Sequence, residues 1–328
     1  MRIPEFQYEK PASLEQCFEH LEKSRNETSI LAGGSDLLIN MKLGVAMPRV
    51  VMSIRSLDEL NSLNIDENDN LHIGACCTLS QLAAENIIRD KFPALFMAIK
   101  YVASMHIRNV ATIGGNLCLD TRCWYFNQSK SWRASRKSCY KTGGNLCHAV
   151  KNSKRCHAIN KSDIAPVLMV MDAEVVVKKS GNERRIKISE FFADNGLKPN
   201  LLEVGGILTE IIIPPSPREY QSTFLKVANR RGIDFALGSI AVSINKNAKG
   251  VSGVSLILGS LRSSPVQLKK TAAIILESGL TDKSIENASE TAVTELGTVT
   301  NIYTSAGYKR DLVRALVKKA LHKLINGK

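Results

Sequence analysis

The sequence predicts an α+β fold in three parts: a small α/β unit over residues 1–57, a larger α/β unit over 58–216, and a C-terminal α+β unit over 217–328. Three observations predict it. Short apolar strand patterns alternate with helical patterns in the first two parts. Prolines at 214, 215 and 217 end a strand pattern and suggest a boundary. The last part places alternating strand patterns before helical ones, which is typical of an antiparallel sheet covered by helices.

In the first part, Ser13 is placed to cap a helix that runs through Leu21. The segment TSILAGG (28–34) predicts a short strand that enters a glycine turn, and PRVVMSI (48–54) predicts a second strand. These elements make up the expected small α/β unit.

The second part begins with a strand at LHIGACC (71–77), and Thr78 then starts one helix through LSQLAAENIIR (79–89). A further helix is predicted at 94–104, and a helix or turn at 162–171. Residues 173–188 predict a β-hairpin around Ser180-Gly181-Asn182, and 206–213 predict a strand.

The third part contains three segments that alternate like antiparallel strands, at 224–230, 235–245 and 253–261. Two helical patterns follow, at 267–279 and 308–325. We therefore expect a C-terminal sheet with helices packed on it.

The net charge of +13 is concentrated in one segment. Residues 122–161 contain ten Lys or Arg and no Asp or Glu, which leaves about +3 for the rest of the chain (13 − 10). A general nucleic-acid-binding face is therefore not expected. The first 20 residues lack a long apolar stretch and no run of about 18 apolar residues occurs, so we expect a cytoplasmic protein without a signal peptide or membrane span.

Two glycine-rich segments follow apolar segments: AGGSD (32–36) and ATIGGN (111–116). Glycine pairs let backbone N–H groups approach an anion, and two such loops facing each other can hold the two phosphates of a dinucleotide. Neither segment fits the Rossmann or P-loop pattern. From the residues alone, the alternative that both are simple tight turns stays open.

Four cysteines lie in the basic segment, with the spacing Cys123-x15-Cys139-x7-Cys147-x8-Cys156. In the cytoplasm such cysteines are metal ligands more often than disulfides. Four thiolates suit either one Zn²⁺ or a [4Fe–4S] cluster, and structural thiols are also open. Cys118 is the rival ligand. The remaining three, Cys17, Cys76 and Cys77, lie in apolar patterns and are expected to be buried.

The segments LAGGSDLLINMK, HIRNVATIGGNL and SDIAPVLMVMDAEV, in this order, resemble the FAD domain of molybdenum hydroxylases, and the last part resembles that family's C-terminal flavin-subunit domain. The fold implied is a two-part FAD-binding domain followed by an α+β domain. The resemblance implies that FAD contacts two loops and three further positions, which are Ile30, Leu31, Ala32, Gly33, Gly34, Ser35, Asp36, Leu37, Thr112, Ile113, Gly114, Gly115, Asn116, Asp163, Leu208 and Lys226.

Three of these positions have plainer interpretations. Asp163 is suited to cap the helix that follows it. Lys226 is equally explained as a solvated lysine at a strand end, and Leu208 as an ordinary core leucine.

Within the family, the cysteine segment resembles an insertion in the flavin subunit of 4-hydroxybenzoyl-CoA reductase. That resemblance implies that Cys123, Cys139, Cys147 and Cys156 bind a [4Fe–4S] cluster. His148 and His157 each follow a proposed ligand and are candidates to replace a thiolate, although surface histidines are the plainer interpretation. Trp124, Tyr125, Phe126 and Trp132 are expected either to shield the cluster or to form the core of the loop. The basic residues are expected to offset the cluster's charge, to attract an acidic donor, or only to solvate the loop.

We find no nucleophile or acid–base set in the sequence, so the expected chemistry is that of the cofactors. The resemblance implies an electron-transfer subunit that assembles with a molybdenum-cofactor large subunit and a [2Fe–2S] small subunit as (αβγ)2. A low-potential donor such as ferredoxin would supply electrons, and the holoenzyme would remove the para hydroxyl of 4-hydroxybenzoyl-CoA in anaerobic aromatic degradation.

Two alternatives are kept. One is the flavin subunit of another molybdenum hydroxylase, which oxidises an aldehyde or an N-heterocycle. The other is a zinc-stapled basic binding module.

Overall fold

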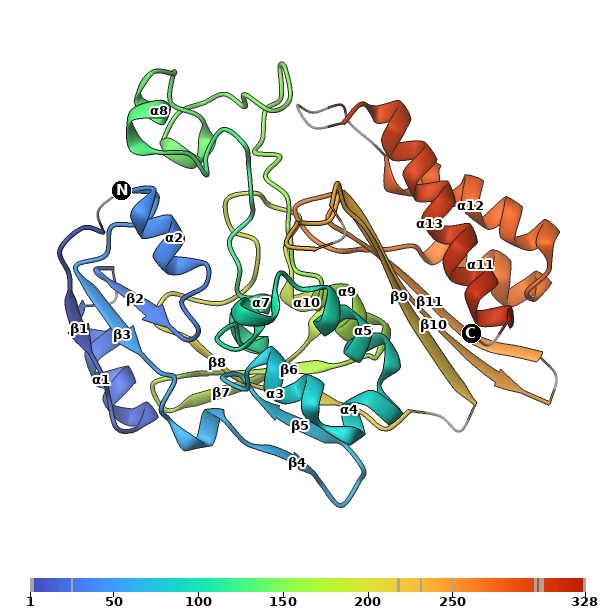
Figure 1. Ribbon diagram of the computed structural model, residues 1–328, viewed down its shortest axis with the longest axis horizontal. Coiled ribbons are helices and arrows are strands. Elements are labelled where there is room, and N and C mark those ends of the chain that lie inside the picture. Colours follow the sequence, from blue (N-terminus) through green and yellow to red (C-terminus); the bar gives the residue numbers. More distant parts are fainter. Residues whose placement is uncertain are drawn as a thin grey trace.

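The computed structural model describes residues 3–24, 26–216, 219–230, 232–248, 250–297, 300 and 304–326. Three sheets lie side by side, and a loop that carries α8 (Lys130–Ala134) projects above the first two (Figure 1). This arrangement agrees with the predicted α+β class. The predicted boundary at 216–217 falls partly on residues 217–218, outside the described part, and stays a prediction. Among the described residues, no helix is long and apolar enough to cross a membrane.

The first sheet is parallel, with the order β1-β3-β2, from β1 (Gln7–Glu9), β3 (Val50–Ser53) and β2 (Thr28–Leu31). Helix α1 (Leu14–Ser24) buries Leu14, Cys17 and Leu21 against this sheet. The Ser13 hydroxyl accepts from the Gln16 N–H, as expected of a cap, and the helix continues one turn past the predicted Leu21. Helix α2 (Leu37–Lys42) follows the first glycine loop.

The second sheet is antiparallel, with the order β4-β5-β8-β6-β7. Its strands are β4 (Leu63–Ile65), β5 (Leu71–Gly74), β8 (Ile207–Ile213), β6 (Glu174–Lys179) and β7 (Asn182–Lys187). The predicted hairpin is β6–β7, and its turn residues Ser180 and Gly181 have positive φ angles of 25° and 71°. The helices packed around this sheet are α5 (Pro93–Tyr101), α6 (Met105–Arg108), α7 (Ile113–Leu117), α9 (Ala165–Val170) and α10 (Ile188–Phe191).

One helix prediction in this part is wrong. The single helix expected over 79–89 is two helices, α3 (Leu79–Ala84) and α4 (Asn86–Lys91). Glu85 between them has extended backbone angles, φ −74° and ψ 126°. The first helix does start as predicted, because Thr78 and Gln81 form a capping box.

The third sheet is antiparallel, with the order β12-β11-β10-β9, from β12 (Val266–Gln267), β11 (Gly250–Gly259), β10 (Gly238–Asn247) and β9 (Tyr220–Val227). Both of its faces are buried. Phe224, Ala241 and Ile257 join the core of the second sheet. The opposite face packs against α11 (Lys269–Ser278), α12 (Asp282–Leu296) and α13 (Ala306–Asn326), which cover it in Figure 1. Helix α12 was not predicted.

Candidate functional site

The two glycine loops touch each other through their backbones. The first, Ala32–Asp36, leads from β2 into α2, and the second, Ala111–Asn116, leads into α7. A Cβ atom added to Gly33 would lie 1.9 Å from the carbonyl oxygen of Val110, so only glycine permits this approach. The sequence places these loops 79 residues apart (111 − 32), and the fold brings them together.

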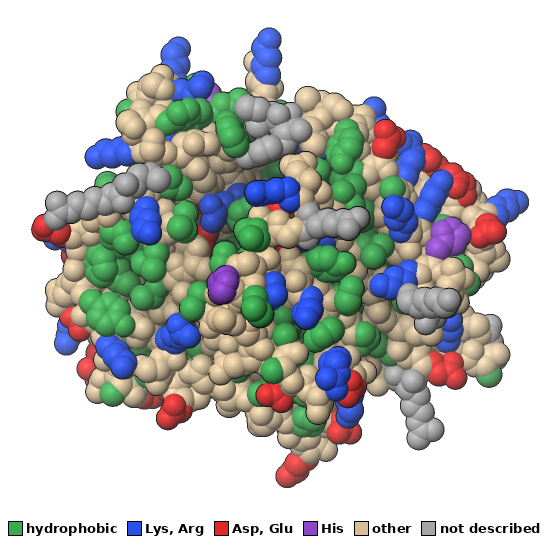
Figure 2. Space-filling view, viewed as in Figure 1, with side chains coloured by type: hydrophobic (Ala, Val, Ile, Leu, Met, Phe, Trp, Pro, Cys, Tyr) green, Lys and Arg blue, Asp and Glu red, His purple; other side chains and the backbone are tan. Residues whose placement is uncertain are grey.

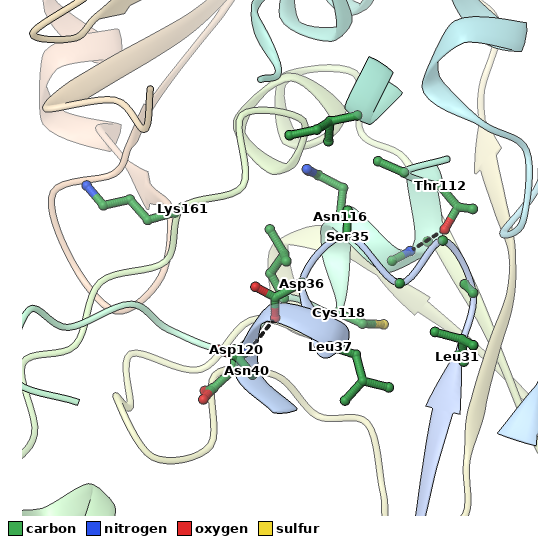
Figure 3. Close-up of a pocket in the computed structure, with 18 of the residues that line it drawn as sticks. Leu31, Ser35, Asp36, Leu37, Asn40, Thr112, Asn116, Cys118, Asp120 and Lys161 are labelled. Atoms are coloured by element: carbon green, nitrogen blue, oxygen red, sulfur yellow. Dashed lines mark hydrogen bonds between the residues drawn. The ribbon is translucent and has the colours of Figure 1, made fainter. Parts of the chain in front are cut away.

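A cavity of about 710 Å³ opens between the loops, within the size range of small-molecule sites (Figure 3). Fourteen of the sixteen predicted cofactor-contacting residues line it. They are Ile30, Leu31, Ala32, Gly33, Gly34, Ser35, Asp36, Leu37, Thr112, Gly114, Gly115, Asn116, Asp163 and Leu208.

The two glycine loops differ in the hydrogen-bonding state of their N–H groups. In the second loop, the N–H groups of Ile113, Gly114 and Gly115 donate to Cys77 O, Ala75 O and Thr112 Oγ1. These three N–H groups are engaged by the protein, and the anion-binding role of this loop stays a prediction. In the first loop, the N–H groups of residues 33–36 have no acceptor within the described chain. The first loop therefore supplies free donors, and the second forms an opposing wall.

Ile113 and Lys226 do not line the cavity. The side chain of Ile113 is fully buried in the core of the second sheet, because α7 turns that face inward. Lys226 contacts the cavity only indirectly, through Asp163, which lines it. Its Nζ lies 2.6 Å from Asp163 Oδ2 and donates to the Tyr101 carbonyl at 2.9 Å, and its side chain is only 6% exposed. The alternative that Lys226 is a solvated strand-end lysine is therefore wrong.

Asp163 keeps one oxygen without a partner. Its Oδ1 is buried and accepts no hydrogen bond, while Oδ2 is paired with Lys226. Burial raises the pKa of Asp163, and the charge of Lys226 opposes that rise. Asp163 is not a helix cap, because Ser162 Oγ accepts from the Ala165 N–H instead. An unpaired buried carboxylate oxygen beside a cavity needs a donor, and a ligand in the cavity can supply it.

Several residues that line the cavity were not predicted. Arg122 forms an ion pair with Asp36, and its guanidinium lies 5.2 Å from the centre of the Phe235 ring. Burial lowers the pKa of Lys161 to about 8, and its Nζ donates to the Ala236 carbonyl at 2.6 Å. No local motif marks these positions. The cluster of basic residues at 122–161, whose two ends are Arg122 and Lys161, is the one signal that points to them.

The four predicted cluster cysteines lie around a second, smaller cavity. Cys123, Cys139, Cys147 and Cys156 all line it, together with His148 and His157. Cys118 lines the large cavity instead, where burial raises its pKa to about 12, so it does not belong to this group. As arranged in residues 118–160, all of which are described, no group of three or more Cys, His, Asp or Glu side chains could hold a metal ion.

Both histidines beside the four thiols have protein partners. His148 Nε2 lies 2.8 Å from the Lys137 carbonyl oxygen, and His157 Nε2 lies 2.8 Å from Ser153 Oγ. Burial raises the pKa of Cys156, and the nearby Lys141 charge opposes the rise. The three other cysteines, Cys17, Cys76 and Cys77, are buried as predicted.

Residues 122 and 159 pair to close the cysteine loop at its base. The Arg122 N–H donates to Ile159 O at 2.8 Å, and the Ile159 N–H donates to Arg122 O at 2.9 Å. Arg133 holds the outer part through its bonds to the carbonyls of Leu43 and Gly44, just after α2. In Figure 2, Lys and Arg side chains project from this part of the molecule.

The aromatic residues of the loop are split between two environments. Tyr125 lies 6.1 Å from Trp132, ring centre to ring centre, and Arg136 lies 4.3 Å from the Trp132 ring. Phe126 lines both cavities. Trp124 is 46% exposed, so it does not shield the cavity.

Comparison with known proteins gives one consistent result. Residues 4–216 match the family model of the FAD binding domain in molybdopterin dehydrogenase, and residues 223–324 match that of the CO dehydrogenase flavoprotein C-terminal domain. The chain is 25% identical to the glyceraldehyde dehydrogenase medium chain of Sulfolobus acidocaldarius, over 98% of both chains. It is 27% identical to the nicotinate dehydrogenase FAD-subunit of Eubacterium barkeri, over 97% of this chain and 95% of that one.

Among solved structures, the fold matches a chain of carbon monoxide dehydrogenase from Hydrogenophaga pseudoflava. The TM-score is 0.81 at 22% identity, and the match covers 98% of both chains. The two-part domain and the C-terminal antiparallel sheet are therefore the fold of that protein.

Proposed function

The chain belongs to the family of FAD-binding subunits of molybdenum hydroxylases, and from this membership we propose that it carries electrons between FAD and partner subunits. The observation that carries the proposal is the cavity between the two glycine loops. The free N–H groups of residues 33–36 suit the FAD diphosphate, and the unpaired Asp163 Oδ1 suits a hydroxyl or N–H donor of the cofactor. When bound, FAD supplies the transfer of one or two electrons.

The residues of this chain bind and orient the cofactor. The first loop donates hydrogen bonds, and the second loop closes the cavity from the other side. Lys226 holds Asp163 at the cavity wall through their 2.6 Å contact, and its charge opposes the rise that burial causes in the pKa of Asp163. Leu31, Leu208 and Phe235 give the cavity an apolar lining that excludes water from part of it.

We further propose that the cysteine loop binds a [4Fe–4S] cluster. All four cysteines line one small cavity, and four thiolates can each ligate one iron of such a cluster. The resemblance of this segment to the insertion in the flavin subunit of 4-hydroxybenzoyl-CoA reductase supports iron over zinc. The zinc-stapled binding module is disfavoured by the family membership as well.

The substrate of the holoenzyme has two candidates. The relatives act on an aldehyde, nicotinate and carbon monoxide according to their names, and this supports oxidation of an aldehyde or an N-heterocycle. The cysteine loop alone supports the second candidate, reductive dehydroxylation of 4-hydroxybenzoyl-CoA. In that case an acidic low-potential donor such as ferredoxin would approach the basic loop.

In either case the partners would be a molybdenum-cofactor large subunit and a [2Fe–2S] small subunit in an (αβγ)2 assembly. Relatives are named medium chains and FAD-subunits, which supports a multi-subunit enzyme.

The cofactor content tests the first two proposals. Anaerobically purified protein should contain one FAD and about four iron and four sulfide per chain. The variant Cys139→Ser should lose iron and keep FAD. The matched control Cys17→Ser should keep both, because Cys17 lines neither cavity. Zinc in place of iron would refute the cluster, and protein that binds no FAD would refute the flavin site.

The substrate is tested on the holoenzyme. An aldehyde or an N-heterocycle should bleach the flavin of the oxidised enzyme if the first candidate holds. If the second holds, 4-hydroxybenzoyl-CoA should reoxidise the dithionite-reduced enzyme, and aldehydes should leave the flavin oxidised.

A further inference from the structure

Three side chains in mutual contact connect the linings of the two cavities. Phe126 is the one residue of the described chain that lines both cavities. Asp120 lines the large cavity, and Lys141 lines the cysteine cavity. An ion pair between Asp120 and Lys141 joins the two sides. Figure 3 shows Asp120 beside the α2 end of the large cavity.

Lys141 is a fixed, desolvated cation. Its Nζ lies 2.6 Å from both carboxylate oxygens of Asp120 and donates to the Thr121 carbonyl at 3.2 Å. The same Nζ lies 4.7 Å from the centre of the Phe126 ring. Its side chain is only 5% exposed, whereas Lys137 and Lys151 on the same loop are exposed. Salt screens a buried charge much less than an exposed one.

The sign of its effect follows from electrostatics. Reducing a cluster by one electron makes it more negative, so a fixed positive charge nearby stabilises the reduced state and raises the reduction potential. The Asp120 carboxylate lines the large cavity, and its negative charge would lower the reduction potential of a flavin there. The electron comes from the external reductant, and neither side chain gains or loses a proton.

We propose that the Lys141–Asp120 pair sets the difference in reduction potential between the two cofactors, with Lys141 raising that of the cluster and Asp120 lowering that of FAD. The inference rests on the proposed cluster and FAD sites and adds a role for two residues outside the ligand set. Both act as positioning charges, and neither touches a substrate. The Phe126 ring packs against the Lys141 ammonium group, whereas the Asp120 side chain is 43% exposed.

Redox titration of the purified protein tests this, with cluster reduction followed by electron paramagnetic resonance and flavin reduction by absorbance. At a fixed solution potential, we expect Lys141→Met to raise the ratio of oxidised to reduced cluster at least tenfold. For one electron, this corresponds to a reduction potential lower by about 59 mV. The charge-preserving Lys141→Arg should stay within threefold of wild type. Asp120→Asn should raise both potentials, and that of the flavin more. The exposed control Lys151→Met should change neither.

The outcomes separate this inference from the proposed function. If the purified wild-type protein contains no iron, the proposed cluster is refuted and the inference fails with it. Lys141→Met with full iron and flavin but an unchanged cluster potential would overturn the inference alone. If Lys141→Met loses its cluster, Asp120→Asn decides: higher potentials support the role of the pair, and unchanged potentials overturn it.

Discussion

Replacing Gly33 by alanine should separate the two glycine loops and weaken FAD binding. The added Cβ would lie 1.9 Å from Val110 O and 2.7 Å from Val110 C, both backbone atoms that cannot rotate away. Ordinary contact begins near 3.4 Å, so the loops must move apart by about 1.5 Å (3.4 − 1.9). Overpacking of this kind costs about 1–3 kcal/mol.

If that cost falls on the bound geometry, the Kd for FAD rises about 5- to 150-fold. The assay is FAD titration of flavin-free protein, together with thermal unfolding with and without FAD. Gly307→Ala in α13 is the matched control, because its Cβ would meet nothing closer than 3.7 Å. We expect it to bind FAD as wild type does. Gly33→Ala protein with wild-type affinity and stability would refute the claim that backbone contact between the loops shapes the cavity.

Three further predictions concern buried and bridging charges. Lys226→Met leaves the Asp163 carboxylate buried without its cation, so urea denaturation should show a loss of about 3–5 kcal/mol, against at most about 1 kcal/mol for the control Lys318→Met, whose side chain is partly exposed. Burial lowers the pKa of Lys161 to about 8 from 10.5, so the unfolded chain binds more protons between these values. The stability of wild type relative to Lys161→Met should therefore rise from pH 8 to pH 10.5, and a flat or falling difference would contradict this. Arg133→Met removes the bonds to the two carbonyls after α2, so hydrogen exchange should become faster over residues 123–158 and stay unchanged in the three sheets. Unchanged exchange in that loop would mean that Arg133 does not anchor it.

Much of the fold follows from local patterns. The strands β6 and β7 alternate around a clear turn, and β10 is buried on both faces, with Ile240, Val242 and Ile244 toward the helices and the small residues Ser239, Ala241 and Ser243 toward the second sheet. Helix α12 could not be found this way. It buries Ile285, Val293 and Leu296 at helical spacing, but the residues between them on the same face are small ones such as Ala288 and Ser289, so the apolar pattern is weak. The break between α3 and α4 at Glu85 could not be predicted either, because no glycine or proline lies there.

The sequence indicates which residue types belong to the candidate site, but it does not indicate which of them form ion pairs or hydrogen bonds with each other. The glycine loops, Asp163 and Lys226 were named separately, but the ion pair joins residues 63 positions apart, and no local pattern encodes such a distance. The second loop's N–H groups are engaged by Ala75 and Cys77, which lie on a different segment of the chain. Hydrogen bonds of this kind depend on how the segments pack, so they become visible only in three dimensions.

The bridge between Arg122 and Ile159 means that 36 residues (123–158) leave the fold and return to it at one point. Excising them and joining the two ends with a short turn would leave every strand of the three sheets intact. A flavin subunit can thus gain or lose this cysteine-containing loop as a unit. Comparing the shortened chain with the full-length protein would show what residues 123–158 contribute.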